Sequence, residues 1–222
     1  MYKGILFCFL SVLFLSCPFS YTKEMIGLNV SGDKEGLEYF YFSIGNYYKV
    51  PEKEVIIIKQ KGIPDDEIPV VFFIANCAKV KPVTILDLRL KNMTWMDITL
   101  KYGLKPEIFY IPIKLNPGPP YGKAYGYFKK PRNTWDKIVL TNDEIINLVN
   151  LKFISEYHGY APEEVIKMRS SGKKFNEINY EIQKIKNEKN VKKGKSETEK
   201  HSVTEKKFDE IKIKSRGKGK RR

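Results

Sequence analysis

An apolar stripe at helical spacing occurs three times along the chain, each time after a proline. The later copies run from Pro82 to Ile98 and from Pro162 to Ile178, and the first, from Pro51 to Ile68, is one residue longer near its start. Self-similarity of this kind is the sequence signature of repeat architectures. We therefore expect one structural unit to be used three times.

Four kinds of residue recur at fixed offsets in each copy: a β-branched residue, a cation four positions on, a helix-ending residue seven positions on, and an isoleucine that follows an acid. In chain order they are Val55, Lys59, Gly62 and Ile68; Ile85, Arg89, Asn92 and Ile98; Val165, Arg169, Gly172 and Ile178. Proline fits the first turn of a helix, where its missing N–H is not needed. Glycine and asparagine adopt the left-handed conformation that ends a helix. Each copy thus predicts a short helix, a tight turn and the start of another helix.

A second apolar helical stretch precedes each proline. These stretches cover Phe42–Tyr48, Phe73–Ala78 and Phe153–His158. Neither helix of such a pair can bury its stripe alone, so consecutive pairs should stack. The predicted fold is mainly α, with three helix-turn-helix-like repeat units stacked in one domain, around Pro51, Pro82 and Pro162.

Local signals refine the helix boundaries. Residues 67–79 are apolar all round at their centre, which predicts the most buried helix. Thr94 with Asp97 and Thr141 with Glu144 have the spacing of a capping box, which predicts helix starts at both threonines and a long helix over Asn142–His158.

Residues 105–140 interrupt the repeat with a Pro/Gly/Tyr-rich irregular insert, whose six prolines exclude long helices. Ile108–Ile113 is typical of a short strand. The stretch Gly118–Lys130 combines turn residues, aromatic rings and lysines. The candidate binding surface consists of Tyr121, Lys123, Tyr125, Tyr127, Phe128, Lys129 and Lys130.

Two interpretations of this surface remain open. Exposed rings with interleaved lysines suit stacking on bases or sugars, with cations placed on anionic groups. The other interpretation is an aromatic lid over the gap between the second and third units, since buried tyrosine needs only a partner for its hydroxyl.

The N-terminus has the pattern of a secretory signal peptide, expected over residues 1–20, with a leader over residues 21–35. Lys3 precedes the apolar run Ile5–Leu15, which is shorter than the ~20 residues that span a bilayer. Ser20 suits a cleavage site, and Ser16-Cys17 suits lipidation at Cys17 instead. We expect an exported protein, either secreted to the periplasm or anchored as a lipoprotein; a third alternative is that the apolar run stays uncleaved as an anchor. Cys77 then stands alone in the mature domain and is expected to be a small buried hydrophobe.

Positive charge is concentrated at the C-terminus. The 222-residue chain has a net charge of +14, and Lys184–Arg222 holds sixteen Lys/Arg against six Asp/Glu. This composition buries too little apolar surface to fold, which predicts a folded domain over residues 36–185 and a disordered basic tail over residues 186–222. Such a tail suits anionic polymers or lipid surfaces.

Catalytic and DNA-binding chemistry is weakly represented. His158 and His201 form no metal-ligand cluster or triad, so no metal, cofactor or catalytic residue is predicted, and enzymatic activity is uncertain. An unrecognised hydrolase would need a pocket near His158 or the insert. A helix-turn-helix role in nucleic-acid binding would need Arg89 and Arg169 exposed on one face; otherwise these arginines edge an apolar stripe or form ion pairs with Asp97 or Glu177.

Residues 41–178, above all GPPYGKAYGYF (Gly118–Phe128) and MTWMDITLKYG (Met93–Gly103), resemble a set of uncharacterised exported bacterial proteins. The resemblance implies export and a shared fold, and it implies no activity and no site residues. The function expected from the sequence is a non-catalytic helical domain that binds a protein or anionic polymer in the cell envelope.

Overall fold

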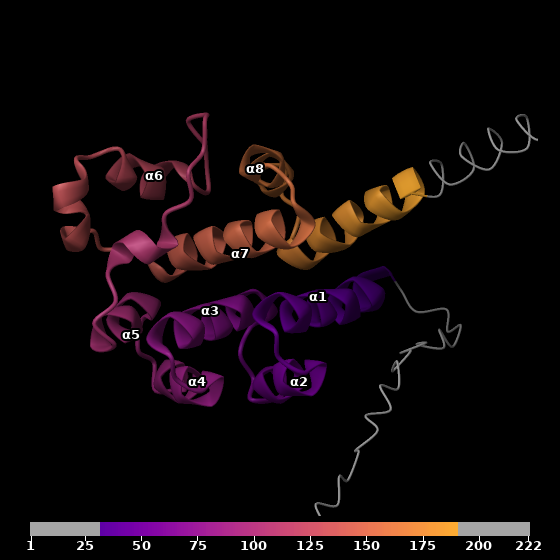
Figure 1. Cartoon of the computed structure of the whole chain (residues 1–222), viewed down its shortest axis with the longest axis horizontal. Coiled ribbons are helices and arrows are strands. Elements are labelled where there is room, and N and C mark those ends of the chain that lie inside the picture. The colour runs from indigo at the N-terminus through magenta and orange to yellow at the C-terminus, as the bar shows by residue number, and fades with distance from the viewer. Residues whose placement is uncertain (1–31, 191–222) are drawn as a thin grey trace, which may run out of the picture.

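A computed structural model describes residues 32–190, and within this range the chain is mainly helical and contains no strand (Figure 1). This confirms the predicted mainly α class. The helices are α1 (Gly32–Tyr48), α2 (Glu52–Gln60), α3 (Ile68–Ala78), α4 (Pro82–Leu90), α5 (Trp95–Lys101), α6 (Gly122–Phe128), α7 (Asn142–His158), α8 (Pro162–Ser170) and a last helix over residues 175–190. Short 3-10 segments are η1 (Asp65–Glu67), η2 (Pro106–Phe109) and η3 (Arg132–Lys137).

Four helices form the centre of the domain in two rows (Figure 1). One row consists of α1 and α3, and the other of α7 and the last helix, with α7 packed against both α3 and α1. Helices α2 and α4 cover the outer side of the first row, and α8 covers the outer side of the second. The insert lies at the α5 end of the domain.

Helix α3 is the apolar centre, as its sequence predicts. Its eight residues from Ile68 to Ala75 are all buried. Its neighbour α7 buries twelve of its seventeen residues, among them Phe153 and Ile154. A helix that is apolar all round must be covered on every side, which explains why α3 contacts α1, α2, α4 and α7.

The three predicted turns share one backbone feature. Gly62, Asn92 and Gly172 have positive φ angles of 87°, 64° and 93°, and each follows a nine-residue helix. Helices α4 and α8 begin at Pro82 and Pro162. Left-handed residues end helices by redirecting the chain, so these local predictions are confirmed.

Both predicted N-caps are also confirmed. The Thr94 side chain accepts a hydrogen bond from the Asp97 N–H, and Thr141 and Glu144 form a complete capping box at the start of α7. The helix bounds Asn142–His158 agree with the prediction.

The predicted strand over Ile108–Ile113 is wrong. The segment begins in the 3-10 helix η2 and continues as extended chain, and no other strand lies among the described residues to pair with it. Its backbone is bonded by a side chain instead: the Ile111 carbonyl accepts a hydrogen bond from the Tyr125 hydroxyl at 2.8 Å.

The expected domain boundaries of residues 36 and 185 lie inside helices. Helix α1 begins at Gly32, and the last helix extends through residue 190. These two ends pack together: Gly36 approaches Tyr180, and Glu35 forms a hydrogen bond with Tyr180. The predicted signal peptide, Cys17 and most of the leader and basic tail lie outside the described residues.

The insert has a small aromatic core of its own. The Trp135 ring lies 4.8 Å from Tyr110 and 5.1 Å from Phe128, measured between ring centroids. Phe109, 5.6 Å from Phe73, joins the insert to α3. Aromatic pairs at these separations add to the stability that burial provides. The insert is also more regular than predicted, since it contains η2, the short helix α6 and η3.

Candidate functional site

Three of the four aromatic rings of the candidate binding surface are buried. Tyr121, Tyr125 and Phe128 are 1%, 4% and 5% exposed. Burial raises the pKa of both tyrosine hydroxyls above the ordinary value. These rings are therefore not available to stack on a ligand, and for them the aromatic lid describes the arrangement better than an exposed binding surface.

The remaining members of the predicted surface face outward. Tyr127 is half-buried, and its ring lies 5.8 Å from the Lys130 ammonium. Lys123 and Lys129 are exposed; Lys129 donates a hydrogen bond to Asn116, and Lys123 lies 4.0 Å from Glu144. Of the seven residues of the predicted surface, only Tyr127 and the three lysines are accessible to a large ligand.

A groove of about 500 Å³, here called the insert groove, opens beside these residues. Its lining consists of Tyr127, Lys130, Pro131, Thr134, Lys137, Ile138 and Val139. Among these described residues two are cations and none is an acid. Val139 is 71% exposed, so the groove also presents apolar surface to solvent.

The sequence-based prediction stopped at Lys130 and missed the second half of this surface. Arg132 lies over the Trp135 ring at 5.1 Å, and Lys137 lines the groove. The signal for them was present, since five cations and a single acid, Asp136, occur between residues 122 and 137.

Arg89 is held inside the fold by a two-point ion pair. Its Nε and Nη2 donate to the Glu67 carboxylate at 2.7 and 2.8 Å, and Nη1 donates to the Met93 carbonyl at 3.1 Å. The hydrogen bonds to Glu67 raise the pKa of Arg89. The nucleic-acid hypothesis required an exposed Arg89, and a buried carboxylate occupies this guanidinium instead.

Arg169 has the same local contacts but a different partner. Its Nη1 donates to the Lys173 carbonyl at 2.9 Å, and its Nε donates to Asn147 at 3.3 Å. The guanidinium lies 4.6 Å from the Phe175 ring, as Arg89 lies 5.0 Å from Trp95. Within the described chain, no carboxylate lies within 4 Å of Arg169.

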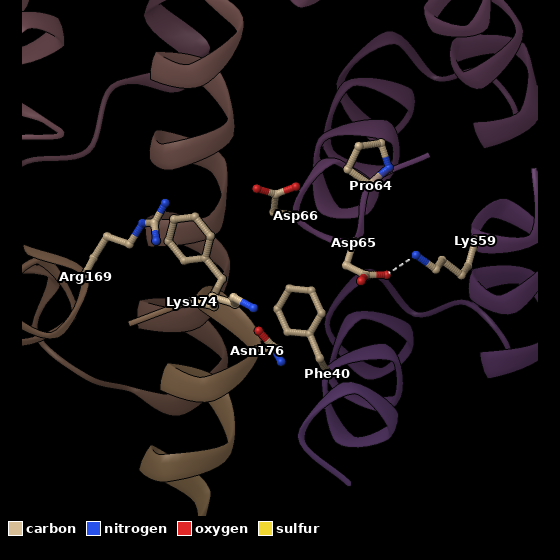
Figure 2. Close-up of a pocket in the computed structure, with 9 residues that line it drawn as sticks. Phe40, Lys59, Pro64, Asp65, Asp66, Arg169, Lys174 and Asn176 are labelled. Atoms are coloured by element: carbon tan, nitrogen blue, oxygen red, sulfur yellow. Dashed lines mark ion pairs between the residues drawn. The ribbon is translucent and has the colours of Figure 1, made fainter. Parts of the chain in front are cut away.

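Arg169 lines a second cavity of about 370 Å³, here called the central cleft (Figure 2). One wall comes from α1, α2 and η1, and the other from α8 and the start of the last helix. The first wall contains Phe40, Lys59, Pro64, Asp65 and Asp66, and the second contains Arg169, Lys174, Phe175 and Asn176.

The charges on the first wall are of two kinds. Asp65 is paired, with Lys59 at 2.5 Å and the Tyr41 hydroxyl as a further donor. Asp66 has no ion-pair partner among the described residues. Burial raises the pKa of Asp66, while the nearby Arg169 lowers it. Asp66 is thus an unpaired acid facing an unpaired cation.

His158 is a buried residue that forms part of a hydrogen-bonded chain of side chains. It is 4% exposed, and its Nε2 bonds Asn179 Oδ1 at 2.8 Å; Asn179 donates to Ser43, which donates to the Tyr39 carbonyl. Burial lowers the pKa of His158. His158 lines neither the insert groove nor the central cleft.

The described residues contain no group of three or more His, Cys, Asp or Glu side chains placed to hold a metal ion. Over the same range, no helix combines the length and the apolar character needed to cross a membrane. Cys77 is half-buried rather than fully buried, and burial raises the pKa of its thiol.

No family model, curated protein or solved structure matches this chain.

Proposed function

We propose that this chain is an exported, non-catalytic helical domain that binds an anionic polymer of the cell envelope through the insert groove. The observation that carries the proposal is the lining of the groove, which includes Lys130, Lys137 and the Tyr127 ring and contains no acid among the described lining residues. Cations in an open groove attract polyanions over about 10 Å at moderate salt.

The polymer class follows from the combination of ring and cations. A half-exposed tyrosine offers a flat apolar face with a polar edge, which suits a sugar ring, and the lysines suit its carboxylates. An acidic polysaccharide fits both features, whereas an acidic polypeptide fits only the second. A basic tail over residues 186–222 would add a long-range electrostatic tether.

Polygalacturonate and polyglutamate of matched length separate these contributions. The full chain should bind polygalacturonate more tightly, and Tyr127→Ser should remove the preference while leaving polyglutamate binding unchanged. Equal affinity of the unaltered chain for the two polymers would show that the groove recognises negative charge and not the sugar ring.

The finer architecture is proposed as three stacked helix pairs. The contacts of Arg89 and Arg169 support it, because each arginine bonds the carbonyl four residues on and covers the ring six residues on. Lys59, at the same position of the first unit, bonds Asp65 instead.

Export is the part of the proposal that a mass measurement tests. A mature protein that begins at a lipid-bearing Cys17, or just after Ser20, in the envelope fraction supports it. Full-length protein in the cytosol would overturn it.

A further inference from the structure

The central cleft has opposite charges on facing walls, and neither charge is satisfied by an ion pair. Asp66 and Arg169 lie on opposite walls of it (Figure 2). They lie more than 4 Å apart, since no ion pair joins them. Lys174 is exposed on the Arg169 wall, and its ammonium group forms no ion pair among the described residues.

Comparison with Arg89 explains why the positive charge of Arg169 has no counter-ion within the described chain. Glu67 precedes Arg89 by 22 positions, and Asn147 precedes Arg169 by the same 22. Both partners are 7% exposed. The carboxylate that neutralises Arg89 is thus replaced by a neutral amide at Asn147, which leaves Arg169 with a full positive charge beside a cavity.

A purely anionic ligand would be repelled by Asp66, and a purely cationic ligand would be repelled by Arg169 and Lys174. A ligand with both charges satisfies both walls. Guanidinium groups bind carboxylates at two points, and a carboxylate is a suitable acceptor for an ammonium group. Phe40 and Phe175 also contribute to the lining, but their side chains are buried, so the charged groups provide the contacts for a ligand.

We propose that the central cleft binds a small zwitterion of the amino-acid type, with its carboxylate on Arg169 and Lys174 and its ammonium on Asp66. The volume of about 370 Å³ is ample for one amino acid. This site is separate from the insert groove, with which it shares no lining residue.

The first test is calorimetric titration of the full chain with L-leucine, N-acetyl-L-leucine and L-leucine methyl ester. Free leucine should bind saturably, and each blocked derivative should bind at least about tenfold more weakly, because each loses one charged contact. Glycine, which carries both charges, should also bind saturably. No saturable binding of leucine, or equal binding of all three leucine compounds, overturns the proposal.

Two variants test the assignment of each wall. Asp66→Asn should remove the discrimination against N-acetyl-L-leucine but keep the discrimination against the ester. Asn147→Glu should neutralise Arg169 without altering any residue that lines the cleft, and should abolish leucine binding. Thermal unfolding of each variant establishes that it is folded. Leucine binding that survives Asn147→Glu in a folded protein contradicts the role of Arg169.

Discussion

Arg89 and Glu67 form a two-point ion pair whose side chains are only 19% and 9% exposed. The equivalent contact of Arg169 is a single hydrogen bond to the neutral Asn147. Two arginines at the same offset of the repeated pattern therefore differ: the charge of Arg89 is neutralised inside the fold, and the charge of Arg169 stays unpaired beside the central cleft.

Removal of Glu67 should damage the fold strongly. Glu67→Gln leaves the Arg89 charge inside the protein without a counter-ion, and we expect a loss of about 3 kcal/mol in the free energy of unfolding. The double variant Glu67→Leu/Arg89→Met should recover part of that loss, because it removes both charges. Urea unfolding measures both quantities.

Arg169 provides the matched comparison. Arg169→Met removes two hydrogen bonds to neutral partners and the contact with the Phe175 ring, but it leaves no buried charge unpaired, so we expect a loss of about 2 kcal/mol, smaller than that of Glu67→Gln. Were Arg169→Met as damaging as Glu67→Gln, Arg169 would have to be neutralised by a group that its present contacts do not include.

Two tyrosines of the insert should respond in opposite ways to the loss of a hydroxyl. Tyr125 donates to the Ile111 carbonyl, so Tyr125→Phe should cost about 1 kcal/mol of unfolding free energy. The buried Tyr121 hydroxyl has no partner among the described residues, so Tyr121→Phe should be neutral or stabilising. Neither change should alter polymer binding, because both rings lie beneath the surface. Loss of binding in a folded Tyr125→Phe protein would instead favour the exposed-ring interpretation.

His158 should make stability depend on pH. Its pKa is lowered in the folded protein by burial, so the unfolded chain binds the proton more tightly. The stabilisation is complete above the unfolded pKa of about 6.5 and is lost as the pH falls below it. The melting temperature should therefore drop between pH 7.5 and pH 5.5. His158→Gln should show a smaller drop over the same interval, and an equal drop would assign the effect to other groups.

The features predicted correctly from the sequence are those that depend on near neighbours. Gly62, Asn92 and Gly172 have positive φ because a local turn requires it, and Thr141 caps α7 through a residue three positions away. Helix α3 is buried because its composition leaves no polar face.

The features that the sequence did not reveal depend on distant contacts. The strand assigned to Ile108–Ile113 failed because no second strand is present among the described residues, which residue preferences within the segment cannot indicate. The burial of Tyr121 and Tyr125 depends on the elements that cover them. The central cleft combines Asp66 with Arg169, which lie more than 100 positions apart in the sequence.

Binding of polygalacturonate by Lys130→Glu/Lys137→Glu tests the proposed function most directly. Lys91→Glu/Lys101→Glu is the control, since it makes the same charge change at two exposed lysines that form no ion pair within the described region. If the insert groove binds the polymer, the groove variant should bind polygalacturonate about tenfold more weakly, with a shallower salt dependence. The control should bind it within about twofold of the unaltered chain. Equal weakening by both variants would contradict the proposed function, because binding would then follow net charge and not the insert groove.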